Sequence, residues 1–477
     1  MLRKLVNDVA VYGFGDILVK AISFVQMPIY TKWLLFSKAE IGLWGSAVSV
    51  VGLVAAVLAL GMDSAYALYF FEAKDEARRR AATSTAILFT LGLTVPVILL
   101  ITAASTSMAG LMLDDSRHRL LLTLAMWLIP FQLIHTLGGQ ALRNQLRPQP
   151  FVALNFLTVL TSVSAGVAVV QSGWGRVEGV MLGSLVGLAL MMPARLWMIR
   201  NLLEFKIDKV LMWKMAAFGA PLVAVSVAYW VSGSSSRLVI LKMRGEADAG
   251  LFTAAANLTV VLTMVNGAVG QAWSPHAFKA YQQDARVASV LFGRVLTLIL
   301  GGFGLLCVGF CTFGREGLLI LTKPEFLAAE SAIIPMALGA YALTTTQVTA
   351  IGISIAKQTR FLAMIAWVAA GVFIGLSALL VPRYGFVGCA WAGCAANIVL
   401  TLIYSLKSQR LTPVTYQFKT ILVLASLTIG GCFASRLLPV EITVRTELLK
   451  AGYCVIFAIA AGLASFSGLR AAQTQTA

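Results

Sequence analysis

The chain has 477 residues, of which 59% are hydrophobic and only 12% are charged. A soluble domain carries about twice that share of charged residues, so the composition excludes an ordinary soluble protein. Long unbroken apolar runs exclude a membrane β-barrel, whose strands are short and alternate in polarity. The formal net charge is +17, but the basic residues lie between the apolar runs. We therefore interpret them as topology signals and contacts with anionic lipid, and we expect no nucleic-acid partner.

Apolar runs long enough to cross a bilayer as helices, which takes about 20 residues, recur about fourteen times. In chain order they cover 9–30, 41–62, 83–105, 120–142, 150–171, 178–199, 212–233, 249–271, 289–313, 331–355, 361–382, 385–406, 419–438 and 448–468. Apolar residues resume after the first and seventh runs, so these two helices are expected to continue to about Leu35 and Leu241. The predicted fold class is all-α integral membrane, because helices satisfy their own backbone groups in lipid.

Lysine and arginine are divided unevenly between the two ends of these helices. If the N-terminus is placed inside, most of the 37 Lys and Arg residues fall in segments on the inner side. Inner loops of membrane proteins carry such an excess. The bias predicts that both termini and the loop from Glu72 to Arg80 are cytoplasmic.

Three short matches link the first and second parts of the chain at an offset of about 208 residues, which indicates an internal repeat. The matched pairs are 39–44 with 247–252, 12–13 with 218–219, and 174–177 with 384–387. Six spans per repeat place both copies in the same orientation. We therefore expect two six-helix bundles related by a pseudo-twofold axis along the membrane normal, with two extra helices. The expected divisions are 1–205, 206–410 and 411–477.

Several stretches carry a family pattern. The opening has Asn7, Asp8, Tyr12, Gly15, Lys20, Phe24, Pro28, Tyr30, Thr31, Glu40 and Gly42, and later stretches are 218–222, Ser236-Arg237, 249–252 and 272–275. In these residues the chain resembles the polysaccharide flippases, which are O-antigen and exopolysaccharide transporters of the MATE-like exporter superfamily. Two positions depart from the family pattern: Ser236 replaces the usual Asp before Arg237, and Phe252 replaces a Tyr.

The resemblance implies a transporter that is not an enzyme and that lies in the bacterial inner membrane. It would move an undecaprenyl-pyrophosphate-linked oligosaccharide from the cytoplasmic to the periplasmic leaflet for polysaccharide biosynthesis. The sugar and pyrophosphate would cross through a cavity between the bundles by alternating access, while the lipid tail stays in the bilayer. Membrane lipids, a polysaccharide polymerase and export machinery are the expected partners.

Three basic residues are candidates for binding the pyrophosphate. Lys20 lies near the centre of the first span, where a charge costs about 2.5–3.5 kcal/mol on insertion scales and so needs a reason. Arg237 follows a small polar run that permits close packing or a local break of the helix. Arg143 ends the fourth span at the cytoplasmic side. The structural alternatives are an ion pair of Lys20 with Asp16, an interfacial anchor at Arg237 and a topology marker at Arg143.

Other polar residues inside the spans have two interpretations. Asp16 and Asp63 are candidates for coupling transport to an ion. His135, Asn257 and Gln271 could bind sugar hydroxyls, as could Asn155, Asn266 and Gln347. All of these side chains could equally bond neighbouring helices.

Two other functions fit parts of the sequence. A cation-coupled multidrug exporter of the same superfamily would share the fold, although Lys20 and Arg237 suit an anion better than a cationic drug. A membrane glycan polymerase or glycosyltransferase would need an acidic site on a sizeable loop. The only acidic pairs on the outer side, Asp114 with Asp115 and Glu246 with Asp248, look like solvated loop charge. The six cysteines lie inside apolar runs without metal-type spacing, and the sequence has no nucleotide-binding loop. We therefore expect no metal and no cofactor.

Overall fold

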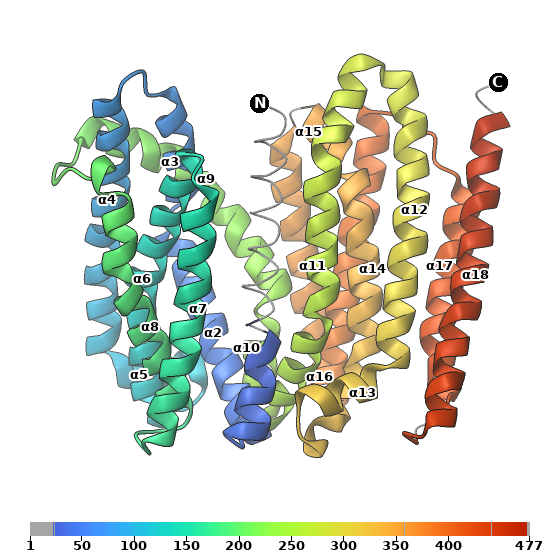
Figure 1. The fold of residues 1–477 in the computed structure, drawn as a ribbon, viewed down its shortest axis with the longest axis horizontal. Helices are drawn as coiled ribbons and strands as arrows, with labels where there is room; N and C mark the ends of the chain where they lie inside the picture. The colour runs from blue at the N-terminus through green and yellow to red at the C-terminus, as the bar shows by residue number, and fades with distance from the viewer. Residues whose placement is uncertain (1–21, 23, 357, 440, 475–477) are drawn as a thin grey trace. The chain divides into compact units, whose positions relative to one another are not determined.

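The computed structural model describes residues 22, 24–356, 358–439 and 441–474, and the regular secondary structure in these ranges is entirely helical (Figure 1). The long helices are α2 (Lys38–Leu58), α4 (Glu76–Ala103), α6 (Arg119–Asn144), α7 (Pro148–Gln171), α8 (Val177–Met198), α9 (Lys209–Gly233), α11 (Glu246–Gln283), α12 (Ala285–Thr312), α14 (Ile333–Thr349), α16 (Thr359–Leu411), α17 (Phe418–Ala434) and α18 (Val444–Thr474). Short helical elements join them: η1 (Ile29–Trp33), α3 (Met62–Glu72), α5 (Ser105–Leu113), η2 (Ser116–His118), η3 (Arg200–Leu202), α10 (Ser236–Arg244), α13 (Gly314–Leu321), η4 (Pro324–Ala332), α15 (Ile351–Ile355) and η5 (Ser435–Leu437).

The predicted fold class is confirmed. Twelve helical segments within the described ranges are long and apolar enough to cross a membrane. One of them, α16, has 53 residues and bends at Gly385, where φ is 58° and ψ is −141°. The bend separates 359–384 from 386–411, so α16 accounts for the eleventh and twelfth predicted spans. Most of the first predicted span, 9–30, lies outside the described residues.

The chain forms two compact units. The first contains the described residues up to Trp230 and the segment Arg237–Gly250, and the second contains Val231–Ser236 and the chain from Leu251 onward. In the first unit, α6 packs against α2, α4 and α8, and α7 packs against α8. In the second unit, α12 packs against α14, α17 and α18, and α14 packs against α16. The extra helices α17 and α18 therefore lie on the α12 side of the second unit.

Helix α9 packs within the first unit, although the repeat assigns it to the second half of the sequence. Met215 joins the buried core that includes Met62 and Tyr66. Trp230 donates from Nε1 to the backbone oxygen of Ser49 at 3.0 Å. The contacts therefore divide the chain later than residue 205, and the division into repeat-related halves remains our proposal.

Two predicted spans are interrupted, one by residues in the left-handed backbone conformation and one by a short polar turn. Leu60 and Gly61, at φ 47° and 59°, separate α2 from α3. At this break the Gly61 backbone lies against the Gly219 backbone of α9, too close for a Cβ on either residue. The turn at Ser234 and Ser235 separates α9 from α10. The seventh span thus continues past Leu241 after a local break, as the sequence indicates.

The starts of α2 and α11 are arranged alike. Each follows a residue in the left-handed region, Leu35 at φ 56° before α2 and Gly245 at φ 87° before α11. Ser37 caps α2 in a capping box with Glu40, and Glu246 stands in the first turn of α11. Arg176 forms an ion pair with Glu40, and His118 Nε2 lies 3.0 Å from Glu246 Oε1. Both contacts are within the first unit, at the end of the helices that the charge bias places outside.

Candidate functional site

Among the described residues of the first unit, Arg195 of α8 is the most deeply buried charge, and it is the centre of a polar cluster. The residue is only 1% exposed. Its Nη1 donates to the backbone oxygen of His135 on α6 at 3.1 Å. Its Nη2 donates to Oδ1 of Asn155 on α7 at 2.8 Å. His135 Nε2 also lies 3.1 Å from that Asn155 oxygen. We call these three residues the Arg195 cluster.

The packing of α6 against α8 makes room for this guanidinium. A Cβ on Gly138 would come within 2.9 Å of Arg195 Cγ and Cδ, and one on Gly139 within 2.9 Å of its Nη1. Glycine at both positions therefore leaves the channel that the Arg195 side chain fills. The apolar residues around it in α8 keep water out, and Arg195 Nε has no hydrogen-bond partner within the described ranges.

The Arg195 cluster carries a positive charge that only neutral groups solvate. Arg195 has no ion pair with any acidic residue that the structure describes. A charge inside a membrane costs free energy unless it is paired or has a function. The cluster fastens α6, α7 and α8 to one another and leaves that charge uncompensated. It therefore raises the electrostatic potential in this part of the first unit.

Arg143 lies further along α6, at its last turn, and is exposed. Its guanidinium carbon sits 5.2 Å from the centre of the Phe151 ring. Its Nη2 donates to Gln140 Oε1, and Gln140 Nε2 donates to Asn144 Oδ1 at 2.8 Å. Phe151 also lies against Gly139 beside Arg195. Arg143 at the end of α6 and Arg195 of α8 are thus two positive charges of the first unit. Arg143 is exposed and Arg195 is buried.

Arg237 lies in the first turn of α10, directly after the break at Ser234 and Ser235. The side chain is half-buried, and its Nε has no hydrogen-bond partner among the residues described here. Ser236, at the position of the family aspartate, supplies no charge. Within the described part of the chain, Arg237 therefore has no acidic partner. Lys20 and Asp16 lie outside the described residues.

The other predicted site residues are separated in the structure. Asp63 is exposed in the first turn of α3, just after the break at Gly61. Asn257 donates to the Thr253 backbone oxygen of its own helix at 3.0 Å. Gln271 is exposed on α11. Of the three candidate sugar contacts, only His135 belongs to a cluster with other polar side chains.

Arg195 was not singled out from the sequence, although this residue lies inside the predicted span 178–199. Two signals could have found it: the apolar residues on both sides of Arg195, and the paired Gly138 and Gly139 inside an apolar run. Asn266 and Gln347 likewise meet each other, since Gln347 Nε2 donates to Asn266 Oδ1 at 3.0 Å. These three side chains, Asn155, Asn266 and Gln347, thus form hydrogen bonds to side chains of other helices. Such bonds are the structural alternative to binding sugar hydroxyls.

In the part of the chain that the structure describes, no group of three His, Cys, Asp or Glu side chains could hold a metal ion. The described cysteines are all free thiols. The polar chemistry of the Arg195 cluster is hydrogen bonding and positive charge.

Known proteins match this architecture. A family model described as "Polysaccharide biosynthesis protein" matches residues 5–282. A solved structure of the lipid II flippase MurJ in an inward closed conformation matches with a TM-score of 0.75 and 15% identity, covering 95% of this chain and 98% of that one. A crystal structure of a MATE protein in complex with MaL6 matches with a TM-score of 0.60 and 15% identity. The match covers 84% of this chain and 95% of that one. A MOP superfamily transporter from Pyrococcus furiosus, described as having a binding pocket of reverse polarity, matches with a TM-score of 0.57 and 13% identity. The match covers 84% of this chain and 95% of that one. The chain matches no curated protein sequence.

The fold is that of a multi-pass integral membrane protein and is similar to the solved structures of MurJ and of the MATE transporters. The family match covers more than half of the chain, and the protein belongs to the polysaccharide biosynthesis protein family. This confirms the family and the fold that the sequence motifs indicate.

Proposed function

We propose that this protein moves an undecaprenyl-pyrophosphate-linked oligosaccharide from the cytoplasmic to the periplasmic leaflet, and that it is not an enzyme. The observation that carries the proposal is that two basic side chains inside the helices, buried Arg195 and half-buried Arg237, have no acidic partner among the described residues. Within a family of polysaccharide biosynthesis proteins, such charges suit a lipid-linked sugar whose reactive end is an anion.

The sign of these charges favours the lipid-linked sugar flippase over the multidrug exporter. Two unit charges 4 Å apart interact by about 4 kcal/mol at the effective dielectric of a protein near its surface. A cationic drug near Arg237 would be repelled on that scale, whereas pyrophosphate would be attracted. Attraction also offsets part of the free energy that pyrophosphate loses when it leaves water. The cation-coupled multidrug exporter is therefore the weaker alternative.

Each basic residue has a proposed place along the path. Arg143, exposed at the cytoplasmic end of α6, would capture the pyrophosphate as it arrives. Lys20 would hold it in the middle of the path, and Arg237 would hold it in the outer half. An arginine can bind phosphate oxygens through two parallel hydrogen bonds. Cations at different depths would pass the ligand on, because no single site holds it at full strength.

The sugar and the driving force involve other residues. His135 of the Arg195 cluster, Asn257 and Gln271 remain our candidates for contacts with sugar hydroxyls. Asp63, exposed and without an ion pair among the described residues, and Asp16 remain candidates for coupling transport to an ion. We place the protein in the bacterial inner membrane with cytoplasmic termini, delivering its substrate to a polymerase and export machinery.

The test is a flipping assay with purified protein in liposomes. A fluorescent undecaprenyl-pyrophosphate oligosaccharide is placed in both leaflets, and a glycosidase that cannot cross the membrane is added outside. We expect the protein to make the inner-leaflet fraction susceptible to the enzyme, while a cationic dye loaded into the same liposomes is retained. Dye efflux without movement of the lipid-linked sugar would show that the multidrug alternative is correct.

A further inference from the structure

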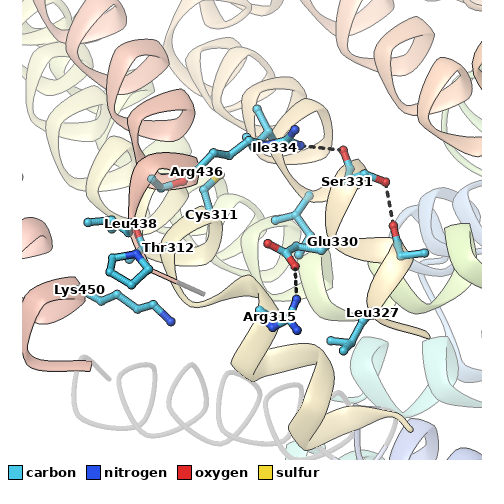
Figure 2. Close-up of a pocket in the computed structure, with 14 residues that line it drawn as sticks. Cys311, Thr312, Arg315, Leu327, Glu330, Ser331, Ile334, Arg436, Leu438 and Lys450 are labelled. Carbon is cyan, nitrogen blue, oxygen red and sulfur yellow. Dashed lines mark hydrogen bonds and ion pairs between the residues drawn. The ribbon is translucent and has the colours of Figure 1, made fainter. Parts of the chain in front are cut away.

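A polar pocket of about 340 Å³ lies in the second unit, at the end of the helices that the charge bias places outside (Figure 2). Its walls come from the ends of α12 and α14, from α13 and η4, and from η5 and α18. The volume is at the small end of the range of ligand pockets, about 300–1,000 Å³. The pocket is remote in sequence from Arg143, Arg195 and Arg237 and is not part of the proposed transport path.

The charged residues that line the pocket are Arg315, Glu330, Arg436 and Lys450, and their charges sum to zero only together with Glu316 and Glu447, which pair with Lys450. Lys450 is buried and forms ion pairs with Glu316 and Glu447. Arg315 Nη1 lies 3.6 Å from Glu330 Oε2, a long contact between two side chains that are each about one-third exposed or more. Arg436 is exposed and donates only to the backbone oxygen of Ser331, at 3.4 Å.

Arg436, Arg315 and Glu330 are therefore the three charged groups of the pocket lining with capacity left for a ligand. Figure 2 shows them at the pocket, with Arg436 directed toward Ser331 and Glu330 toward Arg315. A free guanidinium can bind a phosphate, and a half-exposed carboxylate can accept from an ammonium. Because the charged residues around the pocket sum to zero, the site offers no net attraction to a simple anion.

Large exposed apolar side chains lie in the same segments, η5 and the start of α18, that contribute walls to the pocket. Leu437 is 87% exposed, Val444 81% and Leu448 67%. All three stand where η5 ends and α18 begins, at the end of two membrane-spanning helices. Exposed leucine and valine at this level contact lipid, because in water such a patch would be unfavourable. The pocket thus opens at the boundary between the acyl chains and the headgroups.

We propose that this pocket binds the headgroup of a zwitterionic phospholipid of the phosphatidylethanolamine type. Arg436 and Arg315 donate to the phosphodiester, and Glu330 accepts from the ammonium. The acyl chains lie along Leu437, Val444 and Leu448. The bound lipid joins η5 and α18 to η4 and α13, and so ties the extra helices to the rest of the second unit.

The test is native mass spectrometry of the full-length protein purified in detergent. Phosphatidylethanolamine or phosphatidylglycerol with identical acyl chains is added, with and without inorganic phosphate. The wild type should retain one phosphatidylethanolamine in preference to phosphatidylglycerol. Arg436→Ala should bind it about tenfold more weakly, the loss expected for one hydrogen bond between charged groups. Arg445→Ala is the matched control, because Arg445 is an exposed arginine at the start of α18 that does not line the pocket.

A second variant tests the role of the carboxylate. Glu330→Gln keeps the size of the side chain but removes the partner of the ammonium, so the preference for phosphatidylethanolamine should disappear. Equal retention of lipid by Arg436→Ala and Arg445→Ala would overturn the proposal, and so would a wild-type preference for phosphatidylglycerol. Full displacement by inorganic phosphate would show a site for free phosphate instead of a lipid. Glycan transport is not a readout, so this result is independent of the proposed function.

Discussion

Gly42 of α2 and Gly250 of α11 face each other backbone to backbone, and the contact is reciprocal. A Cβ on Gly42 would collide with the backbone oxygen of Glu246, and a Cβ on Gly250 would collide with the backbone oxygen of Lys38. Lys38 and Glu246 are separated by the same number of residues as Gly42 and Gly250. The starts of α2 and α11 therefore contact each other in equivalent ways, within the first compact unit. Such reciprocity is expected if the two starts are equivalent positions of the internal repeat that the sequence predicts.

Alanine at either glycine should destabilise the protein to a similar degree. In both variants the Cβ meets a backbone oxygen, which cannot move aside as a flexible side chain can, so the two helices must separate. Overpacking of this kind costs about 1–3 kcal/mol. We expect Gly42→Ala and Gly250→Ala to lower thermal stability in detergent, and the double variant to lose less than the sum, because one separation relieves both collisions.

Gly92→Ala is the control for these variants, since a Cβ at Gly92 of α4 would meet no atom within 4 Å. It should leave stability unchanged or raise it, because alanine stabilises a helix interior relative to glycine by about 0.5–1 kcal/mol. Strict additivity of the Gly42 and Gly250 effects would contradict the reciprocal contact.

Asn155 should matter far more than Asn257, although both are half-buried amides in apolar helices. Asn155→Leu leaves the buried Arg195 without one of its two acceptors, and losing a hydrogen bond to a charged group costs about 1.5–3 kcal/mol. Asn257→Leu removes only a bond to its own helix. Thermal unfolding of the purified variants compares the two, and Asn155→Asp should be tolerated because a carboxylate still accepts from Arg195. Equal loss in the two leucine variants would mean that Arg195 does not depend on the cluster.

The two ends of the helices should differ in accessibility in intact cells. In a variant without native cysteines, Arg78→Cys lies in the first turn of α4, where the arginine side chain is 70% exposed, and Arg117→Cys lies before α6, where it is 88% exposed. The charge bias predicts that a membrane-impermeant maleimide labels only Arg117→Cys until the cells are opened. Labelling of only Arg78→Cys before the cells are opened would contradict the predicted topology.

The membrane-spanning helices were predictable because the lipid bilayer requires apolar segments of a minimum length. A lipid-facing helix needs an apolar run of sufficient length, and α4, α7 and α12 begin and end close to the predicted limits. The break before α10 was predictable from the small polar run before Ser236. The break at Leu60 was not, because a leucine at φ 47° carries no sequence signal. It depends on the close approach of Gly219, which is a tertiary contact.

The site was less predictable than the fold. His135 and Asn155 were recognised as polar residues inside spans, but their common partner, Arg195, was not. Proximity to a helix end suggested a topology marker, and only the packing of α6 against α8 shows that the side chain turns inward between Gly138 and Gly139. Which polar residues on different helices meet is decided by helix packing, and a single sequence does not encode this as a local pattern.

The central claim is that basic residues in the membrane bind the pyrophosphate, and charge substitution in a glycan-export complementation assay tests it most directly. Loss of a hydrogen bond between charged groups, about 1.5–3 kcal/mol, should reduce export by Lys20→Ala and by Arg237→Ala about tenfold or more, at normal membrane abundance. An aspartate at either position should reduce it further, while Arg410→Ala, an exposed arginine at the end of α16, should export normally. If both alanine variants insert normally and export glycan at the wild-type rate, the two charges are structural and the account is wrong.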